Sequence, residues 1–187
     1  MSVRDGTYLF SGEALMCTTT AGLLRWLCEP ELMSQWMIGV EQVEILEGDP
    51  FTCGARTVVT LSTSFGRFGS GGWRLLGQLD DFDETRLVRT YTMQSLNAGV
   101  MRVATDIAEY TRNVTYDLSA RPAGVQLRCA VKTTIPGLGR FAARSGAKAE
   151  RKPLNRSLDI LSTLAQGRTP SWLQRRWRNS GLSPQAL

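Results

Sequence analysis

The chain has 187 residues, of which 42% are hydrophobic and 21% are charged. This balance excludes wholesale disorder, and the length suits one domain or one domain with a short extension. The net charge of +5 combines −6 over residues 1–110 with +11 over residues 111–187, so the C-terminal part is expected to face an anionic partner or the acidic part of its own chain.

Missing residue types and patterns exclude several classes of site. The chain has no histidine, which excludes Ser-His-Asp and Cys-His catalytic arrangements. Its four cysteines are scattered through the sequence without a CxxC pair, so a zinc site is not expected. We expect no other metal and no redox cofactor. No apolar run approaches the roughly 18 residues of a membrane span, and the first six residues lack a signal-peptide core, so we expect a cytoplasmic protein that does not cross a membrane.

The first part of the chain predicts a strand followed by two short helices. Residues 6–16 alternate weakly between apolar and polar types, which indicates a strand, and the threonines that follow are suitable N-caps for a helix over about residues 20–28. Pro30 ends this helix and can open a second one that carries Trp36. Because helices of about ten residues are unstable alone in water, both are expected to pack on a larger sheet.

From Val40 onward the hydrophobic period changes to two, which predicts a run of antiparallel strands. Residues 80–84 are interpreted as a turn. Residues 95–108 fit either an inserted helix or lid loop, which their helical spacing slightly favours, or a bulged strand. Strands are expected around residues 43–45 and over residues 55–62, 72–82, 87–93, 112–119 and 125–134, the third of them overlapping the turn.

The C-terminal part predicts one long helix and a basic tail. Residues 138–165 are expected to form a helix that is kinked at Pro153, because proline lacks an amide hydrogen and its ring clashes with the carbonyl group of Ala149. The chain is expected to divide into a domain over residues 1–166 and a tail over residues 167–187 with a short amphipathic helix. Beyond the proline the long helix carries an apolar stripe of Leu154, Leu158, Leu161 and Ala165.

Several residues near the start of the chain match the pattern of a known superfamily. They are Trp26, Pro30, Trp36, Gly39, Val43 and the sequence Gly54-Ala55-Arg56. With them, about residues 7–166 resemble the polyketide cyclase/dehydrase and lipid transport superfamily, the START-like or SRPBCC superfamily, which includes birch-type pollen allergens and aromatase/cyclases. The resemblance implies an α+β helix-grip fold: a curved antiparallel sheet of six or seven strands around a long C-terminal helix, with two short helices after the first strand.

The resemblance also implies an elongated apolar cavity between the sheet and the long helix. The function we expect is non-covalent binding or transport of a hydrophobic small molecule, such as a lipid, polyketide or isoprenoid, without a cofactor. Each residue proposed for the cavity wall is equally of a type that fills an ordinary core. The expected ligand-binding residues are Trp36, Trp73, Tyr91, Met93, Tyr116, Leu154, Leu158 and Leu161.

Catalysis is the alternative to simple binding. Glu13 lies in the first strand among apolar neighbours, and a buried carboxylate there could serve in proton transfer. More often such a residue points to solvent or pairs with an arginine such as Arg89. Aromatase/cyclases place polar groups inside the cavity, but no Arg/Tyr/His set can be transferred to this sequence residue by residue. A cyclase/dehydratase without a metal therefore stays the runner-up, and binding is favoured.

Basic residues are spaced for one side of the long helix. Four residues turn a helix by about 400°, so residues at every fourth position drift by about 40° per step and stay on one broad side. This side could bind an anionic surface or an acidic partner, or be a solvated face; no nucleic-acid-binding motif accompanies it. Exposed sheet edges could also pair two chains in a homodimer. The basic residues are Arg140, Arg144, Lys148 and Lys152, with Arg175 and Arg176 in the tail.

Overall fold

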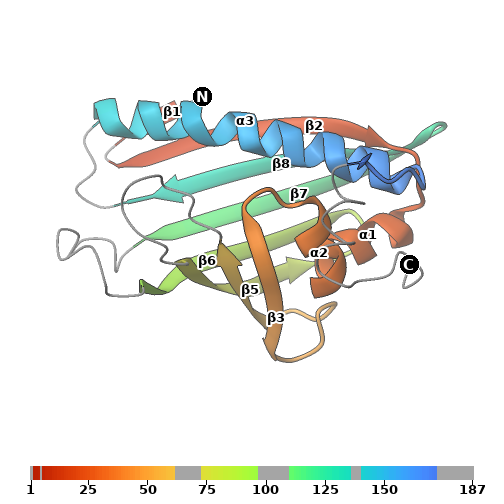
Figure 1. The fold of residues 1–187 in the computed structure, drawn as a ribbon, viewed down its shortest axis with the longest axis horizontal. Coiled ribbons are helices and arrows are strands. Elements are labelled where there is room, and N and C mark those ends of the chain that lie inside the picture. The colour runs from red at the N-terminus through yellow and green to blue at the C-terminus, as the bar shows by residue number, and fades with distance from the viewer. Residues whose placement is uncertain (1, 5, 62–72, 97–109, 136–139, 172–187) are drawn as a thin grey trace.

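The computed structural model describes residues 2–4, 6–61, 73–96, 110–135 and 140–171. These residues form one antiparallel sheet of eight strands in the order β1-β2-β8-β7-β6-β5-β4-β3, with helices packed on it (Figure 1). The architecture is the α+β arrangement expected from the sequence. In this part of the chain no helix is both long enough and apolar enough to cross a membrane.

The sheet has more strands than the six or seven expected, and the additional one is the three-residue β1. The turn expected at residues 80–84 is wrong in its first half. Asp81 and Phe82 still pair with β6 beyond a register shift, and the turn begins at Asp83, whose carboxylate accepts hydrogen bonds from the amides of Thr85 and Arg86. The bounds are β1 Ser2–Arg4, β2 Thr7–Met16, β3 Val40–Glu47, β4 Arg56–Leu61, β5 Trp73–Phe82, β6 Arg86–Leu96, β7 Thr111–Arg121 and β8 Gly124–Thr134.

The ambiguous segment over residues 95–108 lies mostly outside the described residues. Ser95 and Leu96 end β6 as a strand, and residues 97–109 are not described. The tail predicted to carry a short helix is described only as far as Ser171.

The three helices of the described part are α1 Thr20–Cys28, α2 Pro30–Trp36 and α3 Arg140–Ala165. The Thr19 hydroxyl caps α1 by accepting a hydrogen bond from the Gly22 amide at 3.1 Å. Pro30 is the first residue of α2, where its missing amide hydrogen leaves no helical bond unmade. Both predicted short helices are therefore confirmed. α3 runs through Pro153, and the kink expected there stays a prediction.

α3 lies along β2, to one side of the concave face rather than across its middle (Figure 1). Gly12 on β2 permits this approach, because a Cβ atom there would lie 2.8 Å from Asn155 Oδ1 and 2.9 Å from Leu158 Cδ1. The Ser162 hydroxyl donates a hydrogen bond to the carbonyl oxygen of Leu15 at 3.1 Å, which joins the last turns of α3 to the same strand. The space over the middle strands is thereby left to the helices α1 and α2 and to a pocket.

The core lies between the concave face of the sheet and the three helices. Alternate residues of the β7–β8 hairpin face inward as predicted, and Leu158 and Leu161 of the predicted α3 stripe are fully buried. Leu154 and Ala165 at the ends of this stripe are half-buried. The buried hairpin residues are Val114, Tyr116, Leu118, Val125, Leu127, Cys129 and Val131.

Candidate functional site

A pocket of about 170 Å³ lies between the sheet and α3, and α2 bounds it on one side. Its wall consists mainly of aliphatic and aromatic side chains from the inner face of the sheet. A dry apolar cavity of roughly 150 Å³ is large enough to bind benzene, so the space suits a ring-sized group. Polar groups enter the wall at Tyr91, Arg112, Tyr116, Glu150 and Ser157.

The residues predicted to bind ligand divide into three groups. Trp36, Tyr91, Tyr116 and Leu154 lie in the wall of this pocket. Leu158 and Leu161 of α3 are buried in the core instead, and neither is part of the wall of this pocket. The side chains of Trp73 and Met93 lie outside the described part of the structure. Whether the wall residues contact a ligand stays a prediction.

Two contacts fix the Trp36 side chain at the end of α2. Its indole Nε1 donates a hydrogen bond to the carbonyl oxygen of Trp26 on α1, at 2.8 Å. Its ring meets the ring of Tyr116 edge-on, with the centroids 6.5 Å apart and the planes at 77°. The short helices predicted from the sequence thus serve to fix one large side chain against the inner face of β7.

A charged cluster joins α3 to the sheet at the pocket wall. The Glu150 carboxylate accepts a hydrogen bond from the Tyr8 hydroxyl at 2.6 Å and one from Arg112 Nη1 at 2.7 Å. Burial and the nearby Glu150 carboxylate raise the pKa of Tyr8, so its hydroxyl stays a donor. Burial lowers the pKa of Arg112, but Glu150 more than offsets this, so the pKa is raised and the pair stays ionised.

Breaking this cluster is expected to loosen α3. Glu150→Ala removes the acceptor of two hydrogen bonds in a half-buried setting, and we expect the free energy of unfolding to fall by about 1–2 kcal/mol. Glu150→Gln keeps an oxygen for Tyr8 but loses the charge opposite Arg112, so a smaller loss is expected. Urea denaturation measures both, and equal stability of the two variants and the original protein would contradict the role of the cluster.

Polar residues also form a row across the inner face of the sheet. Gly77 leaves room for the side chains of Tyr91 and Thr57 to approach β5, because a Cβ atom at residue 77 would lie 2.7 Å from Tyr91 Cε1 and 2.8 Å from Thr57 Oγ1. The Tyr91 ring therefore lies over β5 and reaches toward β4. The hydroxyls of Thr57, Tyr91 and Thr133 have no hydrogen-bond partner in the described part. In the sheet register the row runs Tyr8, Thr133, Arg112, Tyr91, Gly77 and Thr57.

The fold of this chain is similar to that of several solved structures. No protein-family model and no curated protein sequence matches the chain. The di-domain ARO/CYC StfQ from the steffimycin biosynthetic pathway superposes with a TM-score of 0.64 at 12% identity, over 87% of this chain and 52% of StfQ. Ara h 8.0201 superposes with a TM-score of 0.55 at 16% identity, over 83% of this chain and 98% of its own. The chain has the START-like helix-grip fold.

Proteins without a functional description share this fold as well. Protein CV1439 from Chromobacterium violaceum superposes with a TM-score of 0.61 at 12% identity, over 84% of this chain and 97% of its own. The present chain spans about half the length of the di-domain StfQ. At these identities the likeness concerns the helix-grip fold alone, so the site has to be argued from its own residues.

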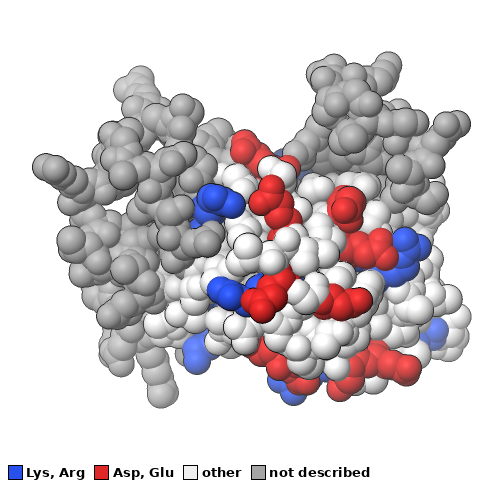
Figure 2. Space-filling view, turned by 90° about the horizontal axis from the view of Figure 1, so that it is seen from below, with Lys and Arg blue, Asp and Glu red and all other residues white. Residues whose placement is uncertain are grey.

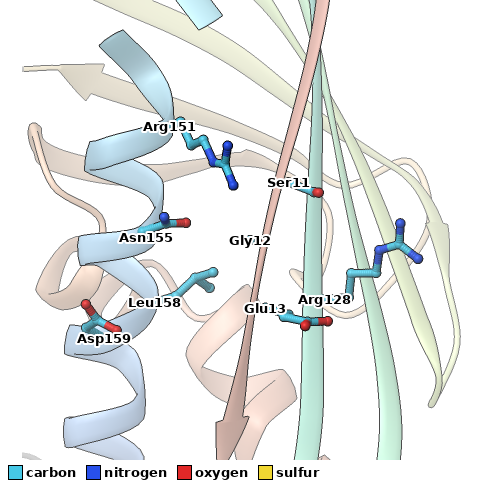
Figure 3. Close-up of a pocket in the computed structure, with 8 residues that line it drawn as sticks. All are labelled: Ser11, Gly12, Glu13, Arg128, Arg151, Asn155, Leu158 and Asp159. Carbon is cyan, nitrogen blue, oxygen red and sulfur yellow. The ribbon is translucent and has the colours of Figure 1, made fainter. Parts of the chain in front are cut away.

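Glu13 lies outside the grip of the sheet and is exposed. An open groove of about 580 Å³ runs between α3 and the free edge of β2 (Figure 3). Figure 3 shows Glu13 and Arg128 on the side of β2 away from α3, whereas Asn155 and Leu158 approach from the helix. Of the alternatives considered for Glu13, the one in which it points to solvent is confirmed, and no buried carboxylate is found at this position. Arg89 is not its partner either, because that side chain is buried on the inner face of β6.

The buried cysteines of the helix-grip core are poor nucleophiles. Burial raises the pKa of the Cys28 thiol to about 11 and that of the Cys129 thiol to about 12, so both stay protonated near pH 7. Cys17 and Cys53 are exposed. Among the described residues, no group of three or more His, Cys, Asp or Glu side chains is placed to hold a metal ion.

The outer surface of the helix-grip domain separates the charges of the two halves of the chain. Figure 2 shows the molecule from below, the side on which β3 lies in Figure 1, and acidic side chains predominate there. Glu41, Glu44 and Glu47 are exposed on β3, which is an edge strand. Two arginines bridge back to this strand, with Arg56 Nη1 3.2 Å from Glu47 and Arg74 Nη2 3.8 Å from Glu44.

The predicted basic side of α3 is exposed as well. Arg144, Lys148 and Lys152 all face solvent, and in the described residues none of the three is in an ion pair. The side chain of Arg140 and the tail residues Arg175 and Arg176 lie outside the description. An anionic or acidic partner for this side, and a homodimer through a sheet edge, stay predictions.

Proposed function

We propose that the protein binds a small hydrophobic molecule non-covalently in the pocket between the sheet and α3. The observation that carries this proposal is the mainly apolar pocket itself, with aromatic rings from Trp36, Tyr91 and Tyr116 in its wall. Because the space is about 170 Å³, a lipid, polyketide or isoprenoid would place one ring-sized part of its body there. Burying a group the size of a phenylalanine side chain contributes about 1.5–3 kcal/mol, so ring-sized fragments are expected to bind weakly.

A cyclase/dehydratase-type reaction is the second candidate. It is supported by the polar groups in the wall and by the structural likeness to StfQ, which is described as an ARO/CYC. The carboxylate nearest the pocket is that of Glu150, but both of its oxygens already accept hydrogen bonds from Tyr8 and Arg112. Such a carboxylate is poorly placed to take a proton from a ligand, so binding without reaction is favoured.

The binding proposal is tested by filling the pocket. Leu154→Trp adds an indole ring at the wall, and we expect the affinity for the neutral probe 2-naphthamide, measured by isothermal titration calorimetry, to fall at least tenfold. Leu46→Trp is the matched control, because it adds the same ring at an exposed position of β3 and is expected to leave the affinity unchanged. Circular dichroism checks that both variants are folded.

Two outcomes would overturn the proposal. One is that the original protein binds no apolar probe and carries no co-purifying small molecule in native mass spectra. The other is that Leu154→Trp binds 2-naphthamide as tightly as the original protein does. Turnover of a bound molecule that stops on Glu150→Gln would favour the enzymatic candidate.

A further inference from the structure

Arg89 is a fully buried cation inside the fold. Its side chain points inward from β6 between Leu87 and Tyr91, and the residue is 1% exposed. Among the described residues it is the only charged side chain buried to this degree. Taking an ion out of water costs several kcal/mol unless an opposite charge and hydrogen bonds compensate it. Its surroundings should therefore contain that compensation.

The contacts of Arg89 compensate little of the cost of burying its charge. Nη1 lies 3.5 Å from the carbonyl oxygen of Leu27 and 3.3 Å from the sulfur of Met33, and Nε has no hydrogen-bond partner within the described ranges. No carboxylate of the described part forms an ion pair with the guanidinium. The Leu27 carbonyl belongs to the last turn of α1, and the end of a helix carries only about half a negative charge. The cation is left under-compensated.

Arg112, in contrast, has a partner of opposite charge inside the fold. Its guanidinium lies 2.7 Å from the Glu150 carboxylate, so it has a partner charge within the protein. Arg89 has no such partner in the described residues, although it is the more deeply buried of the two. Burial lowers the pKa of Arg89 and the neighbouring Tyr91 raises it, and the net shift is upward, so the guanidinium stays charged near pH 7.

Two unused hydroxyl groups lie on the same inner face of the sheet as this cation. The Tyr91 hydroxyl and the Thr57 hydroxyl are both buried, neither has a hydrogen-bond partner among the residues that the structure describes, and both side chains lie close to Gly77. Of these residues, Tyr91 lies in the wall of the pocket, whereas Arg89 and Thr57 do not. Arg89 is two residues from Tyr91 on the same face of β6 and pairs with the wall residue Val114, so the cluster of Arg89, Tyr91 and Thr57 meets the pocket through Tyr91. A buried water molecule would satisfy the hydroxyls, but it would bring no negative charge to the guanidinium.

We propose that Arg89, Tyr91 and Thr57 form an anion-recognising subsite, and that the molecule bound in the pocket carries an ionised oxygen, as a carboxylate or phenolate, beside its apolar body. This inference rests on the proposed binding function and narrows the class of ligand. The apolar wall holds the body of the molecule, and the subsite supplies a charge-assisted hydrogen bond from Arg89 and donors from the two hydroxyls. Ligand binding then completes the charge balance of the interior.

The test compares two probes that differ in charge and share one ring system, 2-naphthoate and the neutral 2-naphthamide. The original protein is expected to bind 2-naphthoate at least tenfold more tightly than 2-naphthamide in calorimetric titrations at pH 7. Arg89→Met should remove at least tenfold of the affinity for 2-naphthoate and change that for 2-naphthamide less than threefold. Arg86→Met is the matched control, since Arg86 is an exposed arginine of the same strand.

The thermal stability of the unliganded protein separates recognition from a structural role. Removing an under-compensated cation is expected to leave Tm unchanged or to raise it. A guanidinium that only ties α1 to the sheet would instead lower Tm on replacement and leave the ratio of the two affinities unchanged, which would overturn the proposal. Tyr91→Phe deletes one hydroxyl without touching the charge, and it should lower the ratio severalfold even if Arg89→Met does not fold.

The remaining outcomes are also decisive. Equal affinity of the original protein for the two probes would overturn the subsite and leave the binding function in place. Failure of both probes to bind would overturn the proposed function together with the subsite.

Discussion

Replacing Trp36 with alanine is expected to lower the free energy of unfolding by about 3–5 kcal/mol. The side chain is 3% exposed, and it fills the space between α1, α2 and the inner face of β7. Its removal leaves a cavity that is continuous with the pocket, because Trp36 is part of the wall. Urea denaturation followed by circular dichroism measures the loss.

Trp36→Phe separates the hydrogen bond from the packing. Phenylalanine keeps an aromatic ring beside Tyr116 but gives up the bond from Nε1 to the carbonyl oxygen of Trp26. We expect it to cost about 1–2 kcal/mol, clearly less than alanine. Trp36→Ala should also admit a larger neutral probe, such as pyrene carboxamide, that the original pocket excludes. A loss of less than about 0.5 kcal/mol in the free energy of unfolding of Trp36→Ala would contradict the conclusion that Trp36 fills the space between the short helices and the sheet.

The local elements could be predicted because their signals lie close together in the chain. Thr19 and Pro30 mark the starts of α1 and α2, and each acts through its own backbone or side chain. The β7–β8 hairpin follows from alternation on either side of one short turn. None of these inferences needs to know what lies across the sheet, which is why they agree with the structure.

The charged cluster and the polar row could not be predicted in the same way. Tyr8, Arg112 and Glu150 come from β2, β7 and α3, and they meet only through the pairing of strands far apart in the sequence. A period of two tells which face of a strand a residue is on. It does not tell which residues of the other strands lie beside it, because register is set by the whole sheet. The sequence therefore offered no sign that these three residues would meet.

Two signals were present in the sequence and could have been used further. Tyr8 and Phe10 are buried, so a strict alternation places Glu13 on the opposite face, where the structure has it. The exposed Leu9 and Leu15 blur that alternation, which is why a buried Glu13 stayed open as an alternative. On β6 the spacing of Leu87, Arg89 and Tyr91 already placed an arginine on the inner face. A charge on an apolar face is the pattern that marks a functional site, and here it leads to the subsite.

Replacing Leu161 with alanine is expected to lower the free energy of unfolding by about 2–5 kcal/mol. Leu161 is fully buried in the last turns of α3, where the helix packs along β2. The pocket depends on this packing, because α3 forms one of its walls through Leu154 and Ser157. We therefore expect the affinity for 2-naphthamide to fall along with the stability.

Arg156→Ala is the matched control on the same helix. Arg156 is exposed, and a substitution there is expected to change the free energy of unfolding by no more than about 0.5 kcal/mol. The comparison isolates the buried side of α3 from its helical propensity, since both variants introduce alanine. Urea denaturation of the two proteins at one pH provides the measurement. Equal stability of Leu161→Ala and Arg156→Ala would show that α3 is not held by its apolar side, and a pocket walled by this helix would lose its structural basis.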